Sequence, residues 1–142
     1  MKKKLAAILD VNNLSVFSNE NPLLQNISFN LKRYSILGII GESGSGKSLT
    51  ALSILNILKY KGLKQIGNIT YNGDNITSYN SNQFRGFLKK EIGIIFQDPS
   101  SYLNPSMKCG DQILEVINQK SSKDFLSEIL KKVKFSNPKE IL

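Results

Sequence analysis

ILGIIGESGSGKSLTAL, residues 36–52, is the stretch that decides how the rest of the chain is interpreted. A short apolar run is followed by a glycine-rich turn, by a lysine and a serine, and then by apolar residues at nearly helical spacing. Residues 41–48, GESGSGKS, match the pattern G-x-x-x-x-G-K-[S/T] at every fixed position. Between a strand-like run and a helix-like run, this pattern predicts a phosphate-binding loop.

The chemistry of this pattern depends on the backbone as well as on the side chains. Glycines allow successive N–H groups to point toward an anion, and the start of the following helix adds a partial positive charge. We expect the Lys47 ammonium to reach the β- and γ-phosphates of a nucleotide, and the Ser48 hydroxyl to bind Mg²⁺. The expected phosphate-binding residues are Gly41, Glu42, Ser43, Gly44, Ser45, Gly46, Lys47, Ser48 and Leu49.

Other glycine motifs do not fit this stretch. A nucleophile elbow, G-x-S-x-G, would need glycine where the chain has Ser45. A dinucleotide-binding G-x-G-x-x-G beginning at Gly44 would need glycine or alanine where the chain has Leu49. The alternative left open is a glycine-rich turn that precedes Lys-Ser without binding phosphate.

Hydrophobic patterning on either side of the loop predicts an α/β fold. Strands are expected at residues 8–17, 23–32 and 67–73, with a buried strand of a parallel sheet at 35–40 and another buried strand at 92–96. Helices are expected at residues 47–58, within 78–90, at 109–120 and at 121–135. In the last helix, Ser121 or Ser122 is the expected N-cap, and the residues expected on one face are Phe125, Ile129, Leu130 and Val133.

The composition excludes several classes of function. The chain has 142 residues and a formal net charge of +8, but its lysines form no dense block, so we expect no nucleic-acid partner. It contains no histidine, which excludes histidine catalysis, and only Cys109, which excludes a disulfide framework. The N-terminal apolar stretch at residues 5–9 is too short for a signal peptide, and no run has transmembrane length, so any membrane role would be peripheral.

Beyond the loop, the sequence resembles the ATP-binding subunits of ABC transporters nearly end to end. Residues 14–55, LSVFSNENPLLQNISFNLKRYSILGIIGESGSGKSLTALSIL, resemble the N-terminal β-subdomain and Walker A motif of that family. Residues 92–105, IGIIFQDPSSYLNP, resemble its Q-loop region. The stretch FQDPSSYLNPSMKCGDQI, residues 96–113, is similar to the oligopeptide, dipeptide and nickel importer branch.

The resemblance implies a partial P-loop NTPase fold of the ABC ATPase type, with an antiparallel β-subdomain, a Walker A strand–loop–helix and the start of a helical subdomain. These parts would span residues 8–33, 35–97 and 98–142 of one incomplete nucleotide-binding domain. The implied cofactors are ATP and Mg²⁺. The implied partners are membrane permease subunits, a second ATP-binding subunit and, indirectly, a substrate-binding protein. The implied location is cytoplasmic, on the inner face of the cell membrane.

The resemblance also assigns roles to single residues. Phe17 would stack on adenine, although an aromatic residue at a strand end can equally be structural. Gln97 would contact Mg²⁺ or the attacking water and sense the transmembrane partner, although it can equally be a plain loop residue. Lys47 and Gln97 are the expected catalytic residues, and Ser48 and Gln97 the expected Mg²⁺ ligands.

The chain departs from the family pattern in several places. Tyr34 stands where the family usually has glycine in a tight turn, and Leu49 where many members have threonine. A turn that needs positive φ would be strained at Tyr34. After Gln97 there is no apolar strand ending in Asp-Glu and no Ser-Gly-Gly, and the chain has no histidine, so the Walker B, signature and switch-histidine motifs are not among the 142 residues.

We therefore expect this chain to bind nucleotide at most and to hydrolyse ATP negligibly by itself, because the base and the cross-dimer clamp are missing. The alternative is a non-catalytic nucleotide-binding or permease-interaction fragment, the product of a split or broken gene. A P-loop kinase is a further alternative, but it leaves Gln97 in IIFQDP unexplained.

Overall fold

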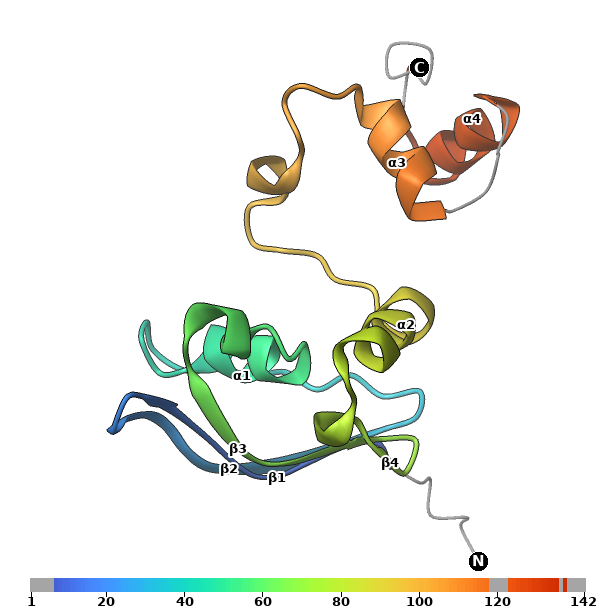
Figure 1. The fold of residues 1–142 in the computed structure, drawn as a ribbon. Helices are drawn as coiled ribbons and strands as arrows, with labels where there is room; N and C mark the ends of the chain where they lie inside the picture. Colours follow the sequence, from blue (N-terminus) through green and yellow to red (C-terminus); the bar gives the residue numbers. More distant parts are fainter. Residues whose placement is uncertain (1–6, 118–122, 136, 138–142) are drawn as a thin grey trace, which may run out of the picture. The chain divides into compact units, whose positions relative to one another are not determined.

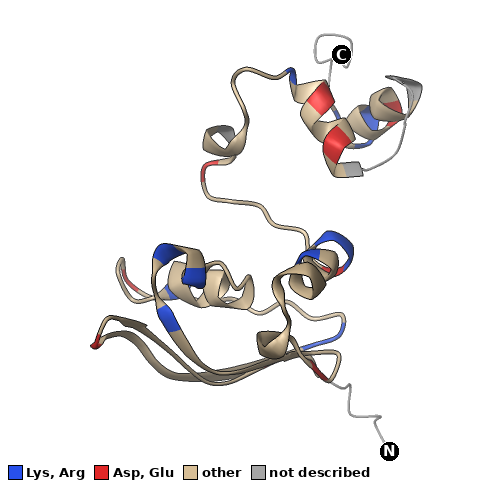
Figure 2. Ribbon diagram, in the orientation of Figure 1, with Lys and Arg blue, Asp and Glu red and all other residues tan. Residues whose placement is uncertain are grey.

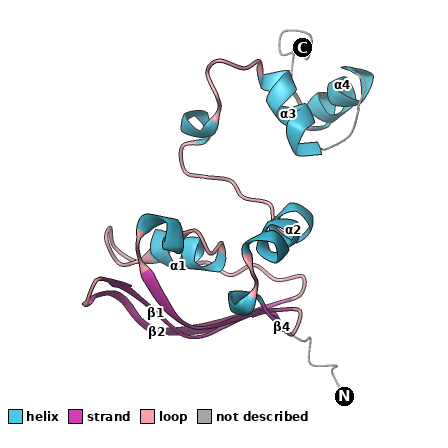
Figure 3. Cartoon of the chain, viewed as in Figure 1, coloured by secondary structure: helices cyan, strands magenta, loops and turns pink. Residues whose placement is uncertain are grey.

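The computed structural model describes residues 7–117, 123–135 and 137. The chain divides into two compact units, Met1–Gly93 and Ile94–Leu142, and each is described by itself. Figure 1 labels the helices and strands of both units, and Figure 3 colours them by type. The expected N-cap of the last helix, Ser121 or Ser122, lies outside the described residues.

An antiparallel sheet is the main element of the first unit. Its order among the described residues is β2–β1–β3–β4, where β1 is Ala7–Ser18, β2 is Asn21–Lys32, β3 is Lys64–Tyr71 and β4 is Asp74–Asn75. The strands predicted at residues 8–17, 23–32 and 67–73 are confirmed, and β3 begins earlier than predicted, at Lys64. The alternating pattern of β2 is also confirmed, since Ile27, Phe29 and Leu31 are half-buried between exposed neighbours.

The ladder between β1 and β2 is interrupted at Asn13 and Asn26, both of which have φ of 51°. Ser28 Oγ accepts the Asn13 N–H at 2.9 Å, and Ser15 Oγ accepts the Asn26 N–H at 3.0 Å. These side-chain bonds satisfy donors that an irregular ladder would leave unpaired. Because the irregularity shifts the alternation of side chains by one residue, Leu14 lies on the same buried face as Leu9 and Val11.

The helices of the first unit cover one face of this sheet (Figure 1). They are α1, Lys47–Ile54, the 3₁₀ turns η1, Leu58–Lys61, and η2, Ile76–Ser78, and α2, Ser81–Glu91. A capping box between Asn80 and Gln83 starts α2, which confirms a helix within residues 78–90. The buried core comprises Leu9, Val11, Leu14, Val16, Leu24, Leu58, Ile69, Ile76, Phe84 and Phe87.

The helix predicted at residues 47–58 is shorter in the structure. It ends at Ile54, and Asn56 follows with φ of 51°, a left-handed conformation that terminates helices. The apolar residue Leu58, which the periodic pattern placed in the helix, lies instead in η1 and is 1% exposed. Burial of Leu58 is therefore achieved by a turn rather than by a continued helix.

The two segments predicted as buried strands are not strands in this structure. Residues 35–40 and 92–96 have extended or irregular backbone, and Ile36 is 100%, Ile40 95% and Ile95 92% exposed. An interior strand of a parallel sheet needs a neighbouring strand on each side and a covering layer on each face. No strand in the described part of the chain pairs with either segment, so the prediction of burial is wrong here.

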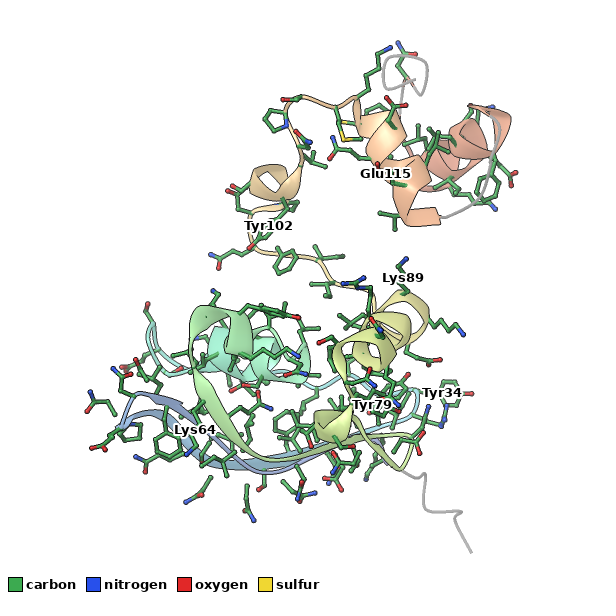
Figure 4. The ribbon with its side chains drawn as sticks, viewed as in Figure 1. Tyr34, Lys64, Tyr79, Lys89, Tyr102 and Glu115 are labelled. Carbon is green, nitrogen blue, oxygen red and sulfur yellow. The ribbon has the colours of Figure 1, made fainter. Side chains whose placement is uncertain are left out.

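The tight turn after β2 confirms the strain expected at Tyr34. This residue has φ of 57°, and its side chain is 97% exposed. Figure 4 shows the ring pointing away from the sheet. Tyr34 therefore adopts the conformation that glycine accepts most readily, with no packing of its ring to offset the cost.

The second unit contains the 3₁₀ turn η3, Pro99–Tyr102, and the helices α3, Cys109–Ile117, and α4, Lys123–Lys132. The two predicted helices are confirmed over the described residues, and α4 ends at Lys132, before the predicted end at residue 135. The predicted face of the last helix is partly wrong, because Val133 is 69% exposed while Leu126, which was not assigned to that face, is 0% exposed. Leu126 and Leu130 lie one helical turn apart and form the buried side of α4. None of the described helices is both long and apolar enough to span a membrane.

Candidate phosphate-binding site

The predicted phosphate-binding loop lies directly before α1. Gly41 to Ser45 are exposed, and Ser45 donates its N–H to Glu42 O at 3.2 Å to close the turn. Gly46 is the N-cap residue of α1, with φ of 92°. A Cβ atom at Gly46 would lie 2.8 Å from Leu24 Cδ1. Glycine is therefore required at this position both by the backbone conformation and by the close approach of β2.

Lys47 folds back over the loop that precedes it. Its Nζ donates to Gly41 O at 2.8 Å, to Glu42 O at 2.5 Å and to Ser45 Oγ at 3.3 Å. The ammonium thus stands where the curve of the loop brings its own oxygens together. A single cation at this point both stabilises the curved backbone and provides the positive charge that an anion would meet.

The first turn of α1 offers unused hydrogen-bond donors. Thr50 donates its N–H to Gly46 O at 2.8 Å, the first backbone bond of the helix. The N–H groups of Lys47, Ser48 and Leu49 donate to no acceptor in the described part of the chain. The Ser48 side chain is exposed at the same turn. Backbone donors, a hydroxyl and an ammonium at one helix N-terminus form a set suited to phosphate oxygens.

Leu49 takes part in this site only through its backbone. Its side chain is half-buried and packs against the core of the first unit. Thr50 and Ser53, also on α1, are buried and donate their hydroxyls to Gly46 O and Leu49 O at 3.0 and 2.8 Å. These hydroxyls are satisfied within the helix, so they are not available to a ligand.

Phe17 lies near the end of β1, at the same end of the sheet as the loop. It is half-buried, and its Cα partners are Pro22 on β2 and Lys64 on β3. The adjacent pair on the β1–β2 ladder includes Leu24, the residue that Gly46 packs against. The structure therefore brings the predicted aromatic residue and the predicted loop to one end of the first unit.

Gln97 belongs to the second unit and is exposed. The residue before it, Phe96, stacks on Tyr102, with ring centroids 4.0 Å apart and an interplanar angle of 13°. This stack closes the segment that carries Gln97 into a compact turn. The proposed contact of Gln97 with Mg²⁺ or water stays a prediction.

Gln112 of α3 holds the loop that follows, and sequence reasoning missed it. Its Oε1 accepts the Asn104 N–H at 2.9 Å, and its Nε2 donates to Asn104 O and Met107 O, both at 3.0 Å. Both the oxygen and the nitrogen of this amide therefore hold the loop between Asn104 and Met107. A lone glutamine within an amphipathic helix provides no sequence signal for such a role.

The residues at the loop are suited to a magnesium–nucleotide complex rather than to a dedicated metal centre. Within the described residues, no group of three or more His, Cys, Asp or Glu side chains could hold a metal ion. The Ser48 hydroxyl is an oxygen donor of the kind Mg²⁺ prefers, and Mg²⁺ is commonly held by few protein ligands together with phosphate oxygens and water. The donor set therefore fits Mg²⁺ that arrives with a phosphate ligand.

Comparison with known proteins gives matches along nearly the whole chain. A family model described as ABC transporter matches residues 24–142. The oligopeptide transport ATP-binding protein AppD of Bacillus subtilis is 31% identical, over 97% of this chain and 45% of its own length. The dipeptide transport ATP-binding protein DppD of Escherichia coli is 36% identical, over 78% of this chain and 35% of its own length.

A solved structure agrees with these matches. The structure of cbiO1 from Clostridium perfringens, part of the ABC transporter complex cbiONQ, has a TM-score of 0.71 and 27% sequence identity. It matches 92% of this chain, which corresponds to 51% of that protein. The chain spans about half, or less, of the length of these relatives.

Proposed function

Because this chain belongs to the ABC transporter family, we propose that its loop at residues 41–48 binds the phosphates of ATP, as part of the ATP-binding subunit of a peptide or nickel importer. Family membership also confirms the fold class expected from the sequence, a partial ABC-type P-loop fold. We further propose that residues 8–33, 35–97 and 98–142 are successive parts of one nucleotide-binding domain.

The observation that carries the proposal is the set of donors at the start of α1. The N–H groups of Lys47 and Ser48 have no acceptor in the described residues, and the Lys47 ammonium lies over the same loop. A triphosphate would replace the loop carbonyls as the partner of this ammonium. Its negative charge would also be favoured by the partial positive charge of the helix N-terminus.

In this proposal, Ser48 would hold Mg²⁺ together with the phosphates, and Gln97 would be a further ligand or would orient water. When bound, Mg²⁺ would neutralise phosphate charge between adjacent oxygens. Phe17 would stack on adenine at the end of β1. Lys47 would stabilise the negative charge on the outer phosphates.

The partners in this proposal follow from the relatives, which are transport ATP-binding proteins. The chain would act with permease subunits, with a second ATP-binding subunit and, through the permease, with a substrate-binding protein. It would associate peripherally with the inner face of the membrane. The second unit, with its Gln112-held loop and exposed Tyr102, would supply the surface for the permease.

Thermal unfolding with and without Mg-ATP tests the binding proposal. Ligand that binds only the folded state should raise the unfolding temperature as its concentration exceeds Kd. Lys47→Ala should abolish the increase, whereas Lys89→Ala on α2, a matched loss of one exposed charge in the same unit, should preserve it. An increase that persists in Lys47→Ala, or no increase in the wild type, would contradict the proposal.

Release of phosphate from Mg-ATP tests the expected lack of hydrolysis. We expect no turnover above a protein-free control, because the 142 residues contain no Walker B carboxylates, signature loop or histidine. Turnover that disappears in Lys47→Ala would show that the chain has catalytic residues that its sequence does not reveal. Turnover that persists in Lys47→Ala would indicate a contaminating enzyme instead.

A further inference from the structure

Lys64 is a basic residue beside Phe17 that no motif singled out. It is the first residue of β3, and its Cα is the direct partner of Phe17 on the β1–β3 ladder. Residues opposite each other in an antiparallel pair point to the same face, with Cβ atoms roughly 4.5–5.5 Å apart. The exposed Lys64 side chain therefore stands next to the half-buried Phe17 ring.

The charge around Lys64 is not balanced by nearby ion pairs. Lys59 and Lys61 precede it on η1, and Figure 2 shows these cations gathered there and at the start of β3. Within the described residues, Lys64 forms no salt bridge. The Lys59 ammonium makes a cation–π contact, since its Nζ lies 5.3 Å from the centroid of the Tyr60 ring. Lys64 is thus an exposed cation with no ion-pair partner in the part of the chain that the structure describes.

The position of Lys64 separates it from the phosphate contacts of the loop. Gly46 reaches the sheet at Leu24, which pairs with Val16 on β1, while Lys64 flanks the other side of β1 at the next residue. The loop therefore lies beside β2 and Lys64 lies on β3, on opposite sides of the same end of β1. If the phosphates of a nucleotide bind at the loop and its base stacks on Phe17, the base and ribose lie next to Lys64.

We propose that Lys64 is a nucleotide-contacting residue that binds the base and ribose end of the ligand beside Phe17. The inference rests on the proposed nucleotide site. The lysine stem extends the apolar surface of the Phe17 ring, and the ammonium donates hydrogen bonds to ring nitrogens of the purine or to ribose oxygens. Lys47 and Lys64 thus act on different parts of one ligand, the phosphates and the nucleoside.

Calorimetric titration of the full chain with Mg-ATP and with Mg-tripolyphosphate tests this assignment. Lys64→Ala should weaken ATP binding about tenfold, as expected for loss of one charge-assisted hydrogen bond, and should leave tripolyphosphate binding nearly unchanged. Lys64→Arg should restore most of the affinity for ATP. Lys89→Ala is the matched control and should leave the binding of both ligands unchanged; Figure 4 labels Lys89 on α2.

The possible results separate this inference from the proposed function. Unchanged ATP binding in Lys64→Ala would overturn the inference while leaving the phosphate loop intact. Equal weakening of ATP and tripolyphosphate would also overturn it, because Lys64 would then act only as a general positive charge. Wild-type chain that binds neither ligand would refute the proposed function and this inference with it. If Lys64→Ala is unfolded by circular dichroism, Lys64→Gln, which keeps a long side chain on β3, takes its place.

Discussion

Replacing Tyr34 by glycine should stabilise the first unit. Tyr34 has φ of 57° in the turn after β2, and 97% of its side chain is exposed. A residue with a Cβ atom in this left-handed region is disfavoured by about 1–2 kcal/mol, and glycine removes that cost. The ring contributes almost no buried surface, so its removal has little opposing effect on packing.

The net effect is smaller than the relief of strain alone. Glycine increases the conformational entropy of the unfolded chain, which lowers stability by about 0.4–1 kcal/mol. Subtracting this from the relief leaves a gain of about 0.8 kcal/mol in the free energy of unfolding. For a chain of this size, such a gain corresponds to a rise of about 2–4 °C in the unfolding temperature.

Urea denaturation followed by circular dichroism measures this difference. Tyr34→Ala is the matched control, because it removes the exposed ring but keeps the Cβ atom and hence the strain. We expect Tyr34→Ala to stay close to the wild type and Tyr34→Gly to exceed both. A Tyr34→Gly variant no more stable than Tyr34→Ala would refute the assignment of strain to this position.

Further predictions concern the sheet. Gly67→Ala should destabilise the fold by about 3 kcal/mol or more, because its Cβ would lie 2.6 Å from Asn13 O at a φ of 112°. Gly73→Ala, with positive φ but open space, should cost less in the same urea titration. Burial, together with the 3.1 Å hydrogen bond to Glu91, raises the pKa of Tyr71. The stability gained from the neutral phenol is therefore present below pH 10 and is lost as the pH rises above 10 through the raised pKa, so Tyr71→Phe should flatten the decline in unfolding free energy above pH 10.

Local sequence patterns were sufficient to predict the loop and the three long strands β1, β2 and β3. The G-x-x-x-x-G-K-[S/T] spacing located Gly46 and Lys47, and alternation located β2, because both depend on residues that are close in sequence. The Tyr34 turn was predicted for a similar reason, since its conformation is decided within a few residues.

Features that depend on distant partners could not be predicted in this way. The apolar run at residues 35–40 indicates a preference for a buried strand, but burial requires neighbouring strands that the described residues do not provide. Asn13 gave no signal that β1 would shift its register there. The role of Gln112 depends on a loop eight residues away, which no helical periodicity encodes.

The exposed segment at residues 35–40 has a thermodynamic consequence for the phosphate loop that follows it. One end of the loop is anchored by α1 and by the contact of Gly46 with Leu24, while the other end follows a segment that no described strand holds in place. Ordering such backbone costs about 1–2 kcal/mol per residue. Any residue of this segment that became ordered only when an anion bound would subtract this cost from the free energy of binding, so the same donors on a supported strand would bind phosphate more tightly.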